Sequence, residues 1–188
     1  VLRGNLVLRA GGDLTLGGRR LADGAVEFTN FDHNDANGLG SANLTPQDPL
    51  YGLDQLADQV WECGIRSIEG SVVVDDGLFK AYRVPNGNLL ISPMMVNENQ
   101  VDVTLTPTAP GQMARLDYRP KTGFFGVVNR VMTGGPESVV FSDDRLASGG
   151  QGTVSGNLPM DYRAPMTKLN AYVGTFRVED PKTFEIGR

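Results

Sequence analysis

The residue types that could carry out chemistry are scarce in this chain. His33 is the only histidine, and it lies in Asp32–Gly38, a stretch rich in Asp and Asn. A Ser-His-Asp mechanism places an imidazole between a nucleophile and a carboxylate. The chain contains no Gly-x-Ser-x-Gly nucleophile elbow. We therefore expect His33 to be a surface loop histidine rather than a general base.

The same stretch invites comparison with a calcium loop. EF-hand spacing requires an oxygen ligand at the fifth position and Gly at the sixth, where this chain has Ala36 and Asn37. Asp32, Asn34 and Asp35 remain weak candidates for an irregular cation or ligand site. One Cys and one His cannot supply the three or four protein ligands of a zinc site. We expect neither a metal nor a cofactor.

Three tripeptides match parts of a serine acyl-transfer site. They are Lys121-Thr122-Gly123, Ser41-Ala42-Asn43 and Ser155-Gly156-Asn157. Enzymes that use Lys-Thr-Gly and Ser-x-Asn motifs also need a serine activated by a lysine three residues later. No serine of this chain has such a lysine. We predict that the tripeptides occur by coincidence and that this chain contains no catalytic residue.

Paired carboxylates offer a weaker alternative. Asp75 and Asp76 follow an apolar run, and neighbouring residues in a strand point to opposite faces, so we expect turn and cap roles. Asp143–Asp144 has the same pattern. An unfamiliar hydrolase would require Asp75 and Asp76, or Asp32 and Asp35, to converge in a pocket.

The N-terminal part of the chain predicts a strand, a helix and a second strand. Asn5–Ala10 alternates apolar residues on one face, and Ile68–Asp75 contains three consecutive valines typical of a strand buried on both faces. Between them a helix is predicted to start at Asp48-Pro49 and to end before Gly64, with Cys63 buried at its apolar end. This order indicates a βαβ-type layer.

The remaining segments are a long loop and an all-β region. Residues Leu21 to Gln47 form an irregular stretch of the kind found in surface insertions or lids. The candidate strands after residue 88 are Gln100–Pro107, Gln112–Tyr118, Phe124–Met132, Ser138–Ser142, Gly152–Asn157 and Leu169–Val178. We predict an α+β, mainly β fold. An accessory domain of residues 1–88, completed by 152–188, would carry an inserted antiparallel β domain, 89–151.

Composition excludes several classes of partner. The net charge is −5 and no Lys/Arg cluster is present, which argues against nucleic-acid binding. No apolar run approaches the roughly 20 residues of a membrane span. The chain begins Val1-Leu2-Arg3 without an initiator Met, and we expect a fragment of a longer protein.

Several segments, taken in order, resemble one family. The most specific is Gly64–Asp76, which reads Gly-Ile-x-x-Ile-x-Gly-x-Val-Val-Val-Asp-Asp. The others are Gly4–Leu8, Gly12–Thr15, Leu53–Ala57, Leu78–Phe79, Pro93–Asn99, Thr106–Pro107, Pro110–Gly111, Asn129–Thr133, Val154–Pro159 and Arg177–Pro181. Together they are similar to class C low-molecular-mass penicillin-binding proteins, the D-alanyl-D-alanine carboxypeptidase/endopeptidase family.

The resemblance is to the large insertion between the first two active-site motifs of that family. It implies that Ser-x-x-Lys would precede Val1, and that the true Ser-x-Asn and Lys-Thr-Gly would follow Arg188. It further implies an accessory, non-catalytic region of a serine-type carboxypeptidase. The implied partners are the protein's own transpeptidase-like domain and peptidoglycan, and the implied location is extracytoplasmic. A stand-alone peptidoglycan- or protein-binding domain is the alternative.

Overall fold

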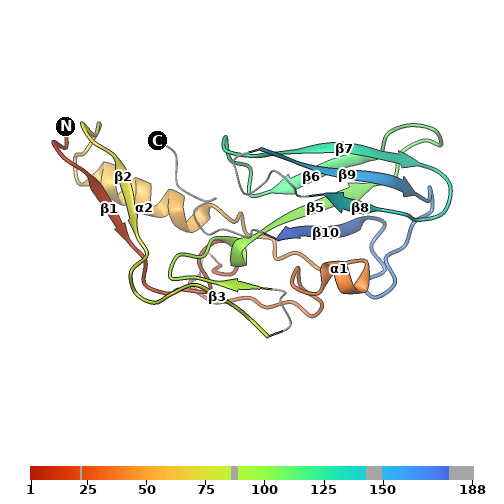
Figure 1. Ribbon diagram of the computed structural model, residues 1–188, viewed down its shortest axis with the longest axis horizontal. Coiled ribbons are helices and arrows are strands. Elements are labelled where there is room, and N and C mark those ends of the chain that lie inside the picture. Colours follow the sequence, from red (N-terminus) through yellow and green to blue (C-terminus); the bar gives the residue numbers. More distant parts are fainter. Residues whose placement is uncertain (22, 86–88, 143–149, 178–188) are drawn as a thin grey trace. The chain divides into compact units, whose positions relative to one another are not determined.

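The structure is a computed structural model that describes residues 1–21, 23–85, 89–142 and 150–177 (Figure 1). The described chain divides into two compact units. The first contains Val1–Glu27 and Pro46–Asn99, and the second contains Phe28–Thr45 and the strands from Gln100 onward. The predicted turn pair Asp143–Asp144 lies outside the described residues.

The first unit is built on a parallel pair of strands. β1 (Leu6–Arg9) pairs with β2 (Val72–Asp75), with Leu6 opposite Val72. Parallel neighbours need a long crossover, and here the crossover carries helix α2 (Tyr51–Glu62). The predicted βαβ arrangement is confirmed.

Helix α2 begins later than the sequence predicts. Asp48 Oδ1 accepts a hydrogen bond from the Leu50 N–H (2.8 Å), and the Asp48 carbonyl accepts one from the Tyr51 N–H (3.1 Å). Asp48 therefore forms a turn ahead of the helix instead of capping it. Gly64, with φ of 85°, ends the helix in the left-handed conformation as predicted.

The rest of the first unit contains a small antiparallel pair and a left-handed turn. β3 (Tyr82–Arg83) pairs with β4 (Leu90–Ile91). The short helix η1 (Asn97–Asn99) has φ between 52° and 56° at all three residues, which costs L-residues roughly 1–2 kcal/mol each. A buried ion pair between Arg19 Nη2 and Glu98 Oε1 (2.6 Å) helps to fix this turn.

The second unit contains two three-stranded sheets. The first sheet is antiparallel in the order β10-β5-β6 and the second has the order β7-β9-β8. Their bounds are β5 Gln100–Thr106, β6 Arg115–Arg119, β7 Gly126–Thr133, β8 Val140–Ser142, β9 Gln151–Leu158 and β10 Tyr172–Arg177. The core includes Val101, Val103, Leu105, Val131, Val154, Leu158 and Phe176.

The six predicted strands and the mainly β α+β class are confirmed, but one sheet differs from the purely antiparallel expectation. β9 lies between β7 and β8. It pairs parallel with β7 and antiparallel with β8. The predicted domain boundaries stay a prediction. The contact grouping differs from them, since β9 pairs with β7 and β10 with β5 inside the second unit.

Candidate functional site

The segment Phe28–Thr45, which contains helix α1 (Ala36–Leu39), is bound to an edge of the antiparallel sheet. Asn37 Nδ2 donates a hydrogen bond to the Thr175 carbonyl (2.8 Å), and the Thr175 N–H donates one to Asn37 Oδ1 (2.9 Å). Because β10 is an edge strand, the Asn37 amide takes the place of a neighbouring strand.

Further contacts fix the same segment. Ala36 and Ala42 pack with Val173 in a buried apolar cluster. The Tyr162 hydroxyl donates a hydrogen bond to the Gly40 carbonyl (2.9 Å). The expectation of a surface insertion is therefore wrong for Phe28–Thr45, which supplies part of the core of the second unit.

A buried charged cluster ties this segment to the sheet. His33 Nδ1 lies 2.9 Å from Asp102 Oδ1, and Arg119 Nε donates a hydrogen bond to Asp102 Oδ2 (3.0 Å). Asp102 and Arg119 are direct cross-strand partners on β5 and β6. Arg119 Nη1 also donates to the Thr45 carbonyl (2.6 Å).

The predicted surface position of His33 is wrong, because only 5% of its surface is exposed. An ionised Asp102 accepts hydrogen bonds, so the neutral His33 ring would carry its proton on Nδ1. Asp102 therefore binds two side chains from different segments and links Phe28–Thr45 to strands β5 and β6.

The sequence-predicted candidates Asp32, Asn34 and Asp35 take different positions in this segment. Asp32 Oδ1 accepts a hydrogen bond from the Asn34 N–H (2.9 Å), and Asn34 Oδ1 accepts one from the Gln100 side chain. Asp35 is exposed at the start of α1 without a side-chain capping bond. In the described ranges, no three His, Cys, Asp or Glu side chains group as metal ligands. A binding role for these residues stays a prediction.

Two of the three tripeptides that match serine acyl-transfer motifs have a side chain in contact with another residue of the second unit. Lys121 Nζ lies 2.6 Å from Asp117 Oδ1, and this bond raises the pKa of the Lys121 ammonium. Ser41 is buried, and its hydroxyl lies 3.0 Å from that of Thr167. Ser155 belongs to β9.

The paired carboxylates at the end of β2 do not form a site. Asp75 Oδ1 accepts a hydrogen bond from the Gly77 N–H (3.1 Å), which confirms its turn role. Both Asp75 and Asp76 are exposed. This arrangement removes the reason to consider a hydrolase built on them.

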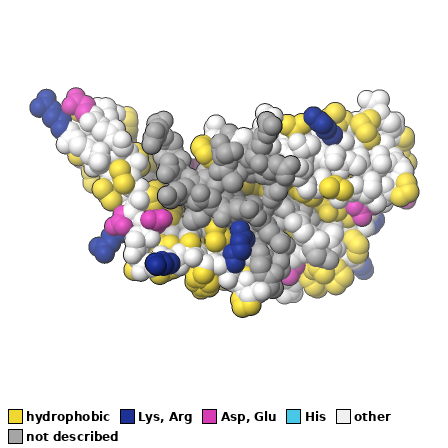
Figure 2. Space-filling view, in the orientation of Figure 1, with side chains coloured by type: hydrophobic (Ala, Val, Ile, Leu, Met, Phe, Trp, Pro, Cys, Tyr) yellow, Lys and Arg dark blue, Asp and Glu magenta, His cyan; other side chains and the backbone are white. Residues whose placement is uncertain are grey.

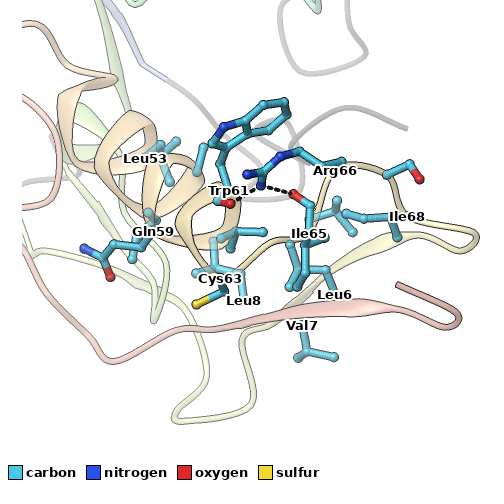
Figure 3. A pocket seen from close by; sticks show the side chains of 15 residues that line it. Leu6, Val7, Leu8, Leu53, Gln59, Trp61, Cys63, Ile65, Arg66 and Ile68 are labelled. Carbon is cyan, nitrogen blue, oxygen red and sulfur yellow. Dashed lines mark hydrogen bonds between the residues drawn. The ribbon is translucent and has the colours of Figure 1, made fainter. Parts of the chain in front are cut away.

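An apolar groove lies in the first unit, between α2 and the β1–β2 pair. Its volume is about 710 Å³ (Figure 3). Its walls are Leu6, Val7, Leu8, Leu53, Leu56, Ala57, Gln59, Val60, Trp61, Cys63, Ile65, Arg66, Ser67, Ile68 and Val72. Leu6 and Leu8 point from β1 toward the helix (Figure 3). We call these 15 residues the α2 groove.

The α2 groove contradicts two expectations from the sequence. Cys63 is exposed rather than buried, and Val72 and Val73 are partly exposed rather than buried on both faces. The periodic apolar face of α2 was visible in the sequence, but no residue of the helix is buried. Periodicity identifies the apolar face and does not show what covers it.

Comparison with known proteins identifies the family. Residues 1–181 match the D-Ala-D-Ala carboxypeptidase 3 (S13) family. The chain belongs to this family. The resemblance to the D-alanyl-D-alanine carboxypeptidase family of penicillin-binding proteins, predicted from the sequence, is confirmed.

This S13 chain is similar to much longer proteins. It is 28% identical over 149 residues to the D-alanyl-D-alanine carboxypeptidase of Actinomadura sp. (strain R39), covering 70% of the chain and 27% of that protein. It shares a fold with penicillin binding protein 4 (dacB) from Haemophilus influenzae, solved with a β-lactam. That match has a TM-score of 0.50 and 16% identity, covering 97% of the chain and 32% of the structure. The chain therefore spans about a quarter to a third of these relatives.

One face of the S13 chain shows how its basic side chains are distributed. On the face shown in Figure 2, Lys and Arg side chains are scattered and do not gather into a basic patch. Within the described residues, no helix combines the length and apolar character needed to cross a bilayer.

Proposed function

We propose that this chain is an accessory, non-catalytic region of a serine-type D-Ala-D-Ala carboxypeptidase that acts on peptidoglycan. The observation that carries the proposal is that no serine among the 188 residues has a lysine three positions later. An acyl-enzyme mechanism of this type requires that pair, since the lysine takes the proton of the attacking hydroxyl.

The engagement of the other reactive residues supports the same proposal. His33 and Asp102 are bound to each other beside Arg119, and the Lys121 ammonium is paired with Asp117. In a longer protein, a transpeptidase-like domain would supply the nucleophile. The accessory region would shape the approach of the polymer or space the active site from the wall. Peptidoglycan as substrate places such a protein outside the cytoplasm.

A fluorescent penicillin tests the proposal. The purified 188-residue chain is expected to show no covalent label after incubation at excess reagent, whereas the longer polypeptide that contains it should be labelled stoichiometrically. A matched sample of the longer polypeptide pre-treated with unlabelled penicillin controls for specific labelling. Stoichiometric labelling of the chain alone, or turnover of a D-Ala-D-Ala peptide by it, would contradict a non-catalytic role.

A further inference from the structure

We infer that the α2 groove is a docking surface for another segment of the same longer polypeptide, an apolar segment that carries a carboxylate facing Arg66. The inference rests on the proposed function, which makes this chain one region of a larger protein. It adds an interaction surface and the chemistry of its occupant.

The helix wall of the groove is apolar, and no described segment of the chain covers it. Leu56 and Trp61 are 38% and 57% exposed, and α2 has no buried residue although its apolar residues recur at helical spacing. Soluble proteins rarely leave a continuous apolar surface of this kind exposed, because burying it away from water lowers the free energy. The groove therefore has the character of one half of an interface.

The sheet wall gives a second, independent indication. β1 and β2 form a two-stranded parallel sheet with no third strand among the described residues. Parallel sheets occur almost only with both faces covered, and isolated strand pairs are marginal in water. Val72, which lines the groove and is 36% exposed, is a side chain that a covering segment would bury.

Charge restricts the occupant. Arg66 is the only charged residue among the 15 that line the groove, and its guanidinium lies 3.9 Å from the centre of the Trp61 ring (Figure 3). Its Nη1 donates to main-chain carbonyls, including that of Ile65 at 3.4 Å. A stacked guanidinium presents its remaining N–H groups in one plane, the geometry that a carboxylate accepts with two oxygens. A carboxylate in an apolar segment is the complementary group.

A segment of the same polypeptide fits these features better than a second copy of the chain. The groove contains no Asp or Glu, so two copies joined through it would bring together cations without a counter-charge. The relatives extend well beyond the matched region, which makes up 27% of the length of one and 32% of the length of the other. A tethered segment has an effective concentration in the millimolar range. The groove would thus be covered as the protein folds.

Cys63 provides a direct probe, because it is the only cysteine of the chain and lines the groove. Its alkylation rate is measured by mass spectrometry of the Cys63 peptide, in the 188-residue chain and in the longer polypeptide. We expect at least tenfold slower alkylation in the longer polypeptide. Asp58→Cys, introduced together with Cys63→Ser, places a thiol on α2 outside the groove and should react equally in both.

Arg66 tests the carboxylate. In the longer polypeptide, Arg66→Glu should restore most of the Cys63 reactivity, whereas Arg66→Lys should restore less because it keeps the charge. Equal Cys63 alkylation in the chain and the longer polypeptide would overturn the inference. Protection in the chain alone that grows with concentration, together with a dimer mass by light scattering, would assign the groove to a second copy and also overturn it. Neither result depends on penicillin labelling, so failure of the proposed function is recognised separately.

Discussion

At the scale of single residues, Asp102 is a side chain that joins two other charged or titratable residues of the second unit. It is fully buried and binds both His33 and Arg119. The sequence did not reveal this role, because the partners are 69 and 17 residues away from Asp102. The local sequence pattern placed His33 on the surface because its partner Asp102 lies 69 residues further along the chain. Asp75 was predicted correctly, since its partner Gly77 is two residues away.

Asp102→Asn should destabilise the second unit by about 3 kcal/mol, because it removes the buried negative charge that accepts the Arg119 Nε hydrogen bond. Urea unfolding followed by circular dichroism measures the change. The matched control is Asp117→Asn on β6, whose exposed pair with Lys121 is screened by water and should change stability much less. An equal loss of stability in the two variants would show that Asp102 does not link Phe28–Thr45 to the sheet.

Tyr162 gives the second unit a sensitivity to alkaline pH. Burial raises the pKa of its hydroxyl to about 12, with a contribution from Glu137. Below pH 10 the hydroxyl is neutral in both states. Above pH 10 the unfolded chain ionises first, so stability falls as the pH rises toward 12.

From pH 8 to pH 11, ionisation of Tyr162 in the unfolded chain should lower the free energy of unfolding by about 1 kcal/mol. Tyr162→Phe should remove that part of the loss, although burial also raises the pKa of Tyr172, which stays in the variant. Urea unfolding at both pH values measures the difference. A variant that loses as much stability as the original protein would contradict the assignment to Tyr162.

At the scale of elements, the sequence predicted the strands well and their partners poorly. Alternation and turn residues located β5 to β10 to within a few residues. The parallel pairing of β7 with β9 depends on where β8 lies, which no local pattern contains. The start of α2 was misplaced because Asp48 can form either a cap or a turn, and the structure uses the turn.

The capping of β10 by Asn37 is the element-scale contact that can be tested most cleanly. Asn37→Ala removes two hydrogen bonds to Thr175 and should destabilise the second unit by about 1–3 kcal/mol. Hydrogen exchange should show faster exchange of the Thr175 amide, whose acceptor is the lost side-chain oxygen. Asp35→Ala, two residues earlier and without a capping bond, should leave that amide protected. Unchanged protection in Asn37→Ala would mean that the edge is covered in another way.

At the scale of the whole molecule, the family was recognisable from the sequence and the surfaces were not. Segments such as Gly64–Asp76 carried the resemblance, and the match of residues 1–181 confirms it. The α2 groove could not be anticipated, because an amphipathic helix looks the same in sequence whether its apolar face is covered by its own unit or by another segment. Segment Phe28–Thr45 was likewise assigned to the wrong surroundings, since it packs with strands far along the chain.

The bond between Asn37 and Thr175 joins residues that are 138 positions apart. During synthesis, the ribosome would release Phe28–Thr45 long before β10 exists to receive it. Contacts of such high sequence separation slow folding, because the chain must close a large loop before they form. The second unit is therefore expected to complete its fold only after β10 has been synthesised, because Phe28–Thr45 needs that strand to pack against.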